Sequence, residues 1–561
     1  MPLRLLFLVC LSLSTYAQNH YPQDYFRTPL EIPILLSGTF AELRTNHFHS
    51  GLDIKTQQRE GLNVVAIADG FVSRIKVSHF GYGKALYITH PNGYTSVYAH
   101  LQRFSPAIEA YVKNHQYEVE NFEIELFPKA EELRVKQSEL VAYSGNTGGS
   151  GGPHLHFEIR DKNEHPINPL LFGIDVKDTT PPAVTSVYVY PIGDDASVNQ
   201  SNKKQALRLI PQKNGDFLTE SIEAFGKIGF GVSVTDRQDL AANKNGVSNI
   251  QTFLNGRQNF ELDFDTFSFE ESKHINQLID YEHFQEQRQR VQKLFIENNP
   301  LSLYRNVIDD GTLTIQDSTH AVYKIKVNDF KNNPAWITIS IKGQKRALTQ
   351  PKNTPVTPYY VYANQPMQLK EGFVAVDFFK DSFYHDFYLD FRVSGDTVTV
   401  HKDVLPLKKE FNIAFDVSKY SETDKDKLFI ARLVGYRNYP VYHSTNRMGN
   451  TLTTKTKTLG TYTLVSDLKN PTIVPINFKN GQWLSNYRYL KLKIDDDLSG
   501  ISSYRATIND TWILMEYDYK TKTLTHDFND GCVTDTKNIL KVIVTDNVGN
   551  SSTFETMFYK K

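Results

Sequence analysis

Two short motifs near the N-terminus carry residue types that bind metal ions. In the first, His49 precedes Asp53 by four residues, and in the second, His154 precedes His156 by two. Because side chains alternate across a β-strand, even spacings place both members of each pair on one face of a strand. Two histidines and one carboxylate can hold zinc and leave a fourth position open for water, which is typical of a catalytic site. Zinc bound in this way lowers the pKa of the water toward about 7 and polarises a carbonyl group.

Either pair alone is weak evidence, because a lone His-x-His on a strand is more often a surface or structural feature. The flanking residues strengthen the interpretation. A glycine-rich stretch, residues 144–152, runs directly into the second pair, and His100 lies between the two pairs in the sequence Tyr-Ala-His-Leu. These glycines sit between two predicted strands, so they indicate a tight loop beside a groove and not a phosphate-binding P-loop.

Together these segments resemble the lysostaphin-type (LytM-like) zinc endopeptidases, which cut peptidoglycan peptides. The resemblance extends over residues 38–172. Besides the two pairs and the glycine-rich stretch, it includes residues 61–72, 98–101 and 166–169. It implies a mainly β peptidase domain that binds one zinc ion per chain.

The resemblance also implies a role for each of the five residues. His49, Asp53 and His156 match the zinc ligands, His154 matches the general base, and His100 matches the histidine that helps to stabilise the transition state. A base must reach the attacking water within hydrogen-bonding distance, and a residue two positions from a ligand on the same strand face can do so. A further imidazole can donate to the developing oxyanion.

Other residues near the motifs are weaker candidates. His47 is expected to face away from the metal, whereas Arg44 and Asn46 could line the groove or serve only the surface. Glu158 shares the strand face of the second motif. It could hydrogen-bond to a ligand, but we expect it to be a solvated carboxylate at the end of a strand.

Length and composition describe an ordinary globular chain. Its 561 residues suggest three or four domains, and 40% hydrophobic with 22% charged residues is a typical balance. Aromatic residues make up 12%, which favours β structure. The formal net charge of −1 gives no reason to expect a nucleic-acid or anionic-membrane partner.

The first 17 residues are predicted to be a signal peptide. Arg4 supplies the positive charge, residues 5–13 form a short apolar core, and residues 15–17 offer a cleavage site. No later segment is long and apolar enough to span a bilayer. We therefore expect an exported protein that is periplasmic or associated with the cell envelope, with no transmembrane segment in the mature chain. Cleavage removes Cys10 and leaves Cys532 without a disulfide partner.

Beyond the signal peptide, we predict a mainly β chain of four modules. Each β-like run is short and bounded by turn residues. The predicted modules are a zinc peptidase domain at 18–175 with an insertion at about 106–134, a β-sandwich (Ig-like) module at 178–345, a β-rich module at 352–463 and a C-terminal β-sandwich module at 465–561.

The two sandwich modules are predicted to be copies of one unit. Each begins with an Asp- and Pro-containing joint, at 178–182 and 467–471, and two further stretches of each module resemble each other. The first copy also carries an insertion at about 267–298 with apolar residues at helical spacing. We expect this helical insertion to pack on its own sandwich.

The leading hypothesis is an exported zinc metalloendopeptidase that hydrolyses peptidoglycan stem or cross-link peptides by a metal-activated water. One alternative is a zinc endopeptidase that acts on an exported protein. Another is a non-catalytic envelope scaffold that activates a different wall hydrolase. In each case the β modules are candidates for binding an envelope protein.

Overall fold

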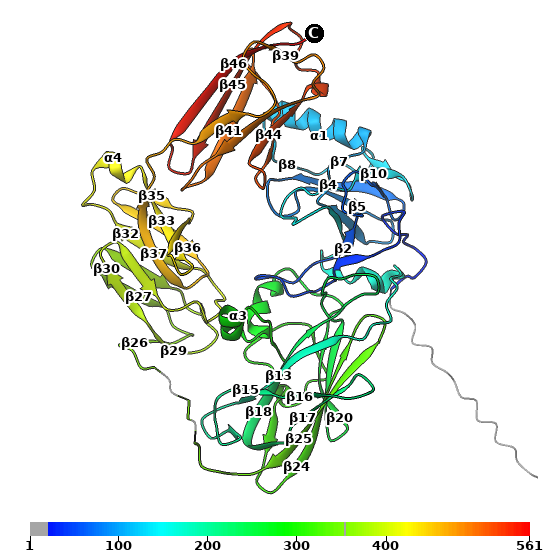
Figure 1. The fold of residues 1–561 in the computed structure, drawn as a ribbon, viewed down its shortest axis with the longest axis vertical. Helices are drawn as coiled ribbons and strands as arrows, with labels where there is room; N and C mark the ends of the chain where they lie inside the picture. The colour runs from blue at the N-terminus through cyan, green and yellow to red at the C-terminus, as the bar shows by residue number, and fades with distance from the viewer. Residues whose placement is uncertain (1–20, 350, 353–354) are drawn as a thin grey trace, which may run out of the picture.

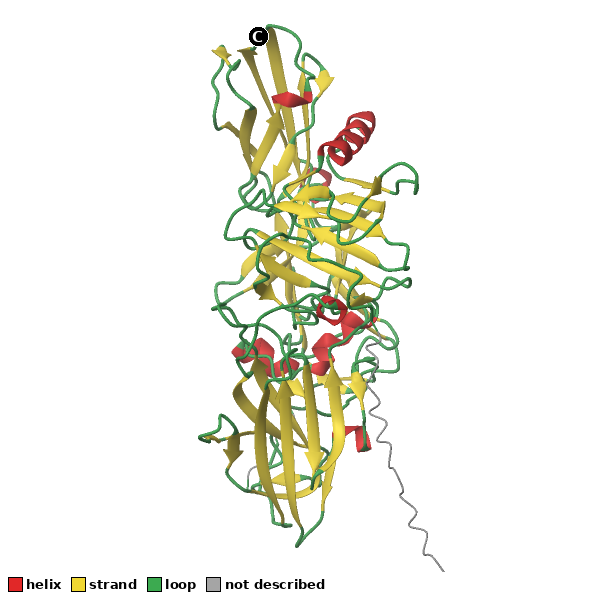
Figure 2. Ribbon diagram, turned by 90° about the vertical axis from the view of Figure 1, so that its right-hand side faces the viewer, coloured by secondary structure: helices red, strands yellow, loops and turns green. Residues whose placement is uncertain are grey.

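The computed structural model describes residues 21–349, 351–352 and 355–561. The predicted signal peptide and Cys10 lie outside the described residues. Strands dominate every part of the chain, and helices are few and short (Figure 2). None of the helices among the described residues has the length and apolar character needed to cross a membrane.

The N-terminal domain is built on two antiparallel sheets. Strands β5 and β6 are largely buried and rich in Val, Ile, Leu, Ala and Tyr, as expected for strands inside a β domain, whereas β4 mixes buried and half-buried residues. The elements are β1 (Leu36–Gly38), β2 (Leu52–Lys55), β3 (Asn63–Val65), β4 (Gly70–Val77), β5 (Lys84–Thr89), β6 (Thr95–Ala99), β7 (Arg103–Phe104), β8 (Ile124–Leu126), β9 (Arg134–Val135), β10 (Leu140–Tyr143), β11 (His154–Arg160), β12 (Pro166–Ile167) and the 3₁₀ turn η1 (Pro169–Phe172). The larger sheet has the order β1-β2-β11-β6-β5-β4-β8, and the smaller has the order β3-β10-β7.

The insertion between β7 and β9 consists of helix α1 (Pro106–Val119) and strand β8. Proline at the first turn suits a helix start, and Glu120 ends the helix in the left-handed conformation. Ile108 and Val112 bury the inner face of α1.

The next module is a β-sandwich with a long strand, β18, that bends across both of its layers. Its elements are β13 (Ala183–Pro191), β14 (Ser197–Val198), β15 (Gln205–Leu207), β16 (Leu209–Pro211), β17 (Phe217–Thr219), β18 (Ile222–Thr235), β19 (Asn249–Leu254), β20 (Arg257–Asp263), β21 (Gln292–Lys293), β22 (Tyr304–Arg305), η3 (Asp309–Gly311), β23 (Leu313–Ile315), β24 (His320–Asn328) and β25 (Pro334–Gly343). One apolar cluster runs without a break from the N-terminal domain into this sandwich.

The predicted helical insertion of this sandwich consists of three short helical segments, η2 (Glu271–His274), α2 (Ile275–Leu278) and α3 (Tyr281–Gln287). It does not pack on its own sandwich alone. The ring of Phe267 lies 5.3 Å from the rings of both Phe40 and Phe48 in the N-terminal domain. The Ser272 hydroxyl accepts a 2.8 Å hydrogen bond from the Phe48 amide. The insertion therefore joins the two domains.

The third module has its own apolar core, separate from the first. Its elements are β26 (Tyr359–Val361), β27 (Met367–Glu371), β28 (Val374–Phe378), β29 (Phe387–Leu389), β30 (Phe391–Ser394), β31 (Thr397–Val400), β32 (Phe411–Asp416), α4 (Glu422–Lys425), β33 (Leu428–Val434), β34 (Tyr439–Tyr442), β35 (Asn446–Met448), β36 (Thr451–Thr456) and β37 (Gly460–Ser466). Two five-stranded antiparallel sheets, β27-β28-β32-β36-β35 and β30-β31-β37-β33-β34, enclose that core.

The C-terminal module repeats the strand pairing of the first sandwich. Its elements are β38 (Thr472–Pro475), β39 (Gln482–Trp483), β40 (Tyr489–Asp495), β41 (Ile501–Ile508), β42 (Thr511–Trp512), β43 (Glu516–Asp518), β44 (Thr523–Asp527), η4 (Phe528–Asp530), β45 (Lys537–Asp546) and β46 (Ser551–Tyr559). Here β38 pairs with β40 and β41-β45-β46 are neighbours, as β13 pairs with β18 and β19-β24-β25 are neighbours in the first sandwich. Cys532 is free and half-buried.

The chain returns on itself, so that the C-terminal module lies against the N-terminal domain at helix α1 (Figure 1). The Tyr117 ring meets the Trp512 ring edge-on at 5.2 Å, and the Tyr117 hydroxyl donates to Asp530 at 2.9 Å. Lys113 on the same helix forms an ion pair with Asp530. Trp512 and Leu514 belong to the apolar cluster of the N-terminal domain, so the contact is part of that core.

An ion pair between Lys84 and Glu516 lies inside this interface. The Lys84 ammonium group is 2.9 Å from one Glu516 carboxylate oxygen and 3.0 Å from the other. The Lys84 side chain is 7% exposed and that of Glu516 is 42% exposed. Burial alone would lower the pKa of Lys84, but Glu516 outweighs it and the pKa is raised. The ammonium group therefore depends on Glu516 for charge compensation.

We predict that Glu516→Gln lowers the stability of the docked C-terminal module, because it leaves the buried Lys84 ammonium unpaired. The loss should be about 1–2 kcal/mol, which lies between the values for exposed and for buried ion pairs. The Lys84→Met/Glu516→Gln double variant should recover most of that loss. Thermal unfolding and protease sensitivity of the module measure the effect. The control is Glu555→Gln, an exposed residue of the same module. Equal stability of Glu516→Gln and the control would contradict the prediction.

Candidate metal centre

The two predicted motifs meet at the centre of the larger sheet. Strands β2 and β11 are antiparallel neighbours, and their register places His156 opposite Asp53. On its other side β11 pairs with β6, where His156 lies opposite Ala99, the residue before His100. Because β11 is an inner strand, it brings His156 to one point with Asp53 and His100, which come from the two flanking strands and their ends.

Three side chains of the motifs converge there. His49 Nε2 lies 2.9 Å from Asp53 Oδ1 and 3.0 Å from His156 Nδ1, and His156 Nδ1 lies 3.0 Å from Asp53 Oδ1. The three residues are 3–8% exposed. Two imidazole nitrogens and a carboxylate oxygen form a donor set that suits zinc.

The second nitrogen of each imidazole has a separate partner. His49 Nδ1 lies 2.7 Å from the Thr39 carbonyl oxygen, and His156 Nε2 lies 2.8 Å from Glu158 Oε1. Both partners are hydrogen-bond acceptors, so each neutral ring carries its hydrogen on that outer nitrogen. The inner nitrogens and Asp53 Oδ1 then direct three lone pairs at one another. A cation placed between them would relieve this repulsion, so the residues present fit a metal ion.

The strand-spacing argument is wrong for the first motif. Strand β2 begins at Leu52, so His49 lies in the preceding loop and not on the strand that carries Asp53. Backbone pairing holds the loop: the His49 amide donates to the Glu42 carbonyl at 2.9 Å, and the Ala41 amide donates to the His49 carbonyl at 2.7 Å. The position of His49 is therefore set by a loop that folds back, and not by strand alternation.

Glu158 is not the solvated carboxylate that we expected. Strand β11 continues to Arg160 between two neighbouring strands, and Glu158 is 0% exposed. Its Oε1 accepts hydrogen bonds from the Ser50 hydroxyl at 2.6 Å and from the Tyr82 hydroxyl, and also binds His156. The Arg160 guanidinium donates to Oε2 at 2.6 Å. Burial opposes ionisation, but Arg160 and His156 hold the pKa of Glu158 well below its ordinary value.

Arg44 contacts the predicted ligand Asp53 directly. Its guanidinium donates to Asp53 Oδ2 at 3.0 Å and to Glu42 at 3.2 Å. Burial raises the pKa of Asp53, but His49 and the other nearby imidazoles outweigh it and hold the pKa well below its ordinary value. Arg44 therefore fixes one carboxylate oxygen while the other faces the imidazoles. By contrast, His47 is exposed and its Nδ1 lies 2.8 Å from the Thr45 carbonyl oxygen.

His154 and His100 lie beside the three converging residues. Their ring centroids are 4.8 Å apart, and His154 Nε2 is 3.4 Å from Asp53 Oδ1. His154 Nδ1 lies 2.9 Å from the Gly152 carbonyl oxygen, and His100 Nδ1 lies 2.8 Å from the Thr147 carbonyl oxygen. Each neutral ring therefore has an unprotonated Nε2. Burial and the neighbouring histidines lower the pKa of His100 to about 3.

Distant modules contribute to both sides of this centre. On one side, the C-terminal module contacts the loop that carries Thr147: Tyr519 donates to the Gly148 carbonyl at 3.3 Å, and Lys520 donates to the carbonyls of Ser150, at 3.3 Å, and Asn146. On the other side, Asn276 of the helical insertion donates to Asn46 at 2.6 Å. No pattern in the sequence predicted these contacts.

Residues 47–117 and 123–169 match Peptidase family M23. The N-terminal domain is an M23 peptidase domain. The two matched stretches contain all five residues of the candidate centre, and residues 118–122, which lie at the end of α1 and just beyond it, fall between them. Residues 358–467 match the Zu5-like domain, which corresponds to the third module.

Several curated bacterial proteins are similar to the M23 domain. The DD-carboxypeptidase/endopeptidase Mpg of Neisseria meningitidis serogroup B is 34% identical over 138 residues, which are 25% of this chain and 26% of that protein. The peptidoglycan DD-endopeptidase ShyC of Vibrio cholerae is 33% identical over 99 residues, which are 18% of this chain and 17% of that protein. The chain thus spans about a quarter or less of the length of these relatives.

The solved structures that match part of this chain include the catalytic domain of lysostaphin from Staphylococcus simulans. It is 20% identical and covers 24% of this chain and 87% of its own, with a TM-score of 0.18. A zinc-containing peptidase from Vibrio cholerae is 24% identical and covers 28% of this chain and 41% of its own, with a TM-score of 0.20.

Close backbone approaches shape the glycine-rich loop, and the one at Gly148 combines with a left-handed backbone. Gly148 has φ +67°, and a Cβ there would lie 2.3 Å from the Gly83 nitrogen and 2.4 Å from the Gly81 carbonyl oxygen. A Cβ at Gly151 would meet nothing within 4 Å. Gly148 is therefore a position that requires glycine, whereas Gly151 is not constrained by its neighbours.

We predict that Gly148→Ala destabilises the domain by about 1–2 kcal/mol through its left-handed backbone, with the clash in addition. It should also displace the Thr147 carbonyl from His100. Thermal unfolding measures the first effect, and the His100 imidazole NMR shifts measure the second. Gly151→Ala is the matched control and should change neither. The prediction fails if both alanine variants behave alike.

Proposed function

We propose that this protein is an exported zinc endopeptidase that hydrolyses peptide bonds in peptidoglycan stem or cross-link peptides. The observation that carries the proposal is the convergence of His49, Asp53 and His156, with His100 and His154 beside them, inside the M23-matched segment. Two imidazoles and a carboxylate with a further pair of histidines form the minimum set for metal-assisted hydrolysis.

His49, Asp53 and His156 would hold one zinc ion. Their lone pairs face one another within 3.0 Å, and their outer atoms are fixed by Thr39, Arg44 and Glu158. Zinc at this point would supply a Lewis acid that activates water and polarises the scissile carbonyl. The chain itself supplies the buried, pre-oriented surroundings in which that charge acts strongly.

His154 is suited to act as the general base. Donation of its Nδ1 hydrogen to the Gly152 carbonyl leaves Nε2 able to accept a proton from the attacking water. His100 is suited to interact with the carbonyl oxygen of the substrate. Its Nδ1 is held by the Thr147 carbonyl, so the neutral ring presents Nε2 as an acceptor, and donation to the oxyanion requires the other neutral tautomer, with the hydrogen on Nε2.

The substrate assignment rests on similarity. The curated relatives with 33–34% identity are named as endopeptidases of the DD type, and one of them is named for peptidoglycan. An exported chain cleaved after residue 17 would meet that substrate in the periplasm or the cell envelope. The modules at 178–345, 352–463 and 465–561 would position the peptidase domain on the wall or on an envelope protein.

We expect the purified mature protein to release uncrosslinked muropeptides from sacculi. Chelation should abolish the release and added zinc should restore it. His154→Ala should reduce the rate by at least about 100-fold, as expected for loss of a general base. Muropeptide chromatography measures the products, and His47→Ala, an exposed histidine in the same segment, should keep full activity.

Two other outcomes would replace this assignment. Cleavage of an exported protein but not of sacculi would mean that the substrate is a protein. Failure of a zinc-loaded sample to cleave either substrate, together with stimulation of another wall hydrolase, would mean that the domain is a non-catalytic scaffold.

The zinc affinity should depend on Glu158, although Glu158 is no ligand. Glu158→Gln removes the charge behind His156 and should weaken zinc binding by about 10–100-fold. Competition with a chromophoric chelator measures the affinity. Glu164→Gln is the matched control, because Glu164 also pairs with Arg160, at 3.0 Å, but its side chain is 56% exposed. Unchanged affinity in Glu158→Gln would rule out this supporting role.

A further inference from the structure

Three aspartates gather where the first sandwich begins. Asp178 precedes β13, Asp236 follows β18, and Asp329 follows β24. One carboxylate oxygen from each residue lies within 4.8 Å of the others. Asp236 and Asp329 are 5% and 2% exposed. Three carboxylates are thus brought together at the end of the sandwich that faces the peptidase domain.

The C-terminal module carries the same arrangement at the corresponding places. Asp467 precedes β38, Asp496 follows β40, and Asp546 ends β45. Their oxygens also lie within 4.8 Å of one another, and Asp467 and Asp546 are 1% and 2% exposed. Two modules with different insertions and different neighbours therefore retain one three-carboxylate cluster.

An asparagine holds each cluster in the same way. Asn333 donates its amide to Asp329 Oδ1 at 2.8 Å, and its side chain donates to Asp329 Oδ2 at 2.6 Å and to the Asp178 carbonyl at 3.3 Å. Asn550 makes the matching bonds to Asp546, at 2.8 Å and 2.8 Å, and to the Asp467 carbonyl at 3.0 Å. The frame of each cluster is rigid and repeated.

Neither cluster is neutralised by a basic side chain. Among the ion pairs of the described residues, none involves any of the six aspartates. The nearby Lys331 pairs instead with Asp175, at 2.5 Å, and Lys469 pairs with Asp497, at 2.6 Å. Burial and the neighbouring Asp178 raise the pKa of Asp236 to about 7. The carboxylates therefore lie together without compensation.

One carboxylate oxygen of Asp236 has no hydrogen-bond donor among the described residues. Asp236 is 5% exposed, and its Oδ1 is buried without a hydrogen-bond partner. In the C-terminal cluster, Asp496 Oδ1 is likewise buried without a partner. Buried oxygens without donors are costly unless a cation or water binds them. The corresponding aspartate in each of the two modules therefore has a buried Oδ1 without a hydrogen-bond donor.

We propose that each sandwich module binds one Ca²⁺ ion, through Asp178, Asp236 and Asp329 in the first and through Asp467, Asp496 and Asp546 in the second. The donors are hard oxygens without nitrogen or sulfur, which excludes a zinc-type site and favours Ca²⁺. Backbone carbonyls and water would complete the six to eight ligands that Ca²⁺ takes.

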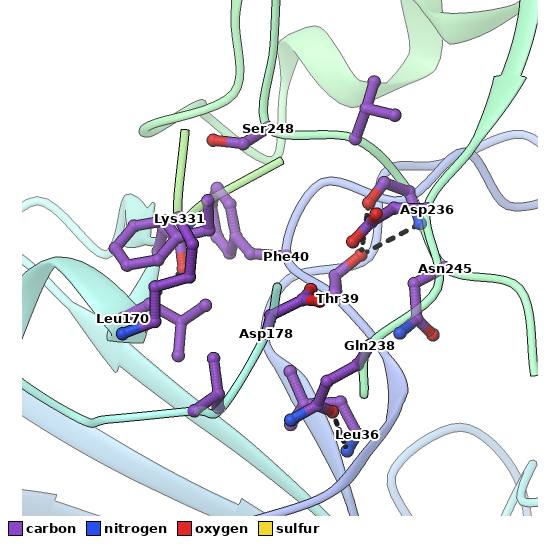
Figure 3. A pocket seen from close by; sticks show the side chains of 15 residues that line it. Leu36, Thr39, Phe40, Leu170, Asp178, Asp236, Gln238, Asn245, Ser248 and Lys331 are labelled. Carbon is purple, nitrogen blue, oxygen red and sulfur yellow. Dashed lines mark hydrogen bonds between the residues drawn. The ribbon is translucent and has the colours of Figure 1, made fainter. Parts of the chain in front are cut away.

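The first site is joined to the peptidase centre by a short path. Asp236 and Asn245 exchange two backbone hydrogen bonds, of 2.9 and 2.8 Å. The adjacent Gly246 amide donates to the Thr39 hydroxyl at 3.0 Å, and the Thr39 carbonyl binds His49 Nδ1. Figure 3 shows Asp178, Asp236 and Thr39 around one cavity between the two domains. Ca²⁺ at this site would thus stabilise the loop that carries a predicted zinc ligand.

The test is Ca²⁺ binding to the full mature chain, freed of other metals and then given one equivalent of zinc. Isothermal titration should show two Ca²⁺ ions per chain, and millimolar Ca²⁺ should raise the unfolding temperature by at least ~5 °C. Millimolar Mg²⁺ should give a much smaller rise, because it prefers octahedral sites with several waters. None of these readouts requires peptidase activity, so they stand or fall independently of the proposed function.

Single substitutions show which cluster binds each of the two Ca²⁺ ions. Asp236→Asn and Asp496→Asn should each remove one equivalent of Ca²⁺ and part of the thermal shift. Without Ca²⁺, each variant should be as stable as the parent chain or more stable, because it loses uncompensated charge. The matched controls are Asp175→Asn and Asp497→Asn, whose side chains are 83% and 57% exposed. They should keep both ions.

Two results would overturn the proposal. One is a Ca²⁺ titration without binding and without a thermal shift. The other is an equal loss of stability in Asp236→Asn with and without Ca²⁺, which would mean that the carboxylates share a proton and serve only the fold.

Discussion

The structure depends on pairing the charges that strand β11 takes out of water. Asp53, His156, Glu158 and Arg160 form a continuous buried series of hydrogen bonds, and removal of Arg160 would leave the buried Glu158 carboxylate without its cationic partner. This requirement fixes the neighbours of β11, because β2 must supply Asp53 and the Ser50 hydroxyl must reach Glu158. The same pairing sets the tautomer of His156 and so aims its inner nitrogen at the other ligands.

The residues of the candidate metal centre are held in place by parts of the molecule that are far apart in the sequence. Thr39 holds His49 and is itself held by Gly246 of the first sandwich. Thr147 holds His100, and its loop is held by Tyr519 and Lys520 of the C-terminal module. The later modules therefore do more than carry the peptidase domain to a surface. They contact the two loops that the catalytic proposal requires.

The modules also differ in how they are held. The first sandwich shares one apolar core with the peptidase domain, whereas the third and C-terminal modules have cores of their own, and only Trp512 and Leu514 of the C-terminal module also join the first core. A shared core makes the first joint rigid through hydrophobic burial. The C-terminal module instead relies on a smaller contact, with Trp512 on Tyr117 and Glu516 on Lys84. The paired carboxylate clusters lie where each sandwich begins, so a bound cation would add a polar contact at each of these two positions.

The sequence by itself determined the residue types of the centre, the mainly β fold and the repetition of the sandwich. Periodicity sufficed for His154 and His156, since both lie on one face of β11. It was wrong about His49, which lies in a loop, and about Glu158, which is buried. Strand alternation describes the two faces of a single strand, but burial also depends on which strands flank it. Only the tertiary structure decided that β11 is an inner strand, that Arg44 reaches Asp53, and that the C-terminal module returns to the peptidase domain. The reason is that these contacts join residues of different segments of the chain, and local sequence patterns do not specify such partners.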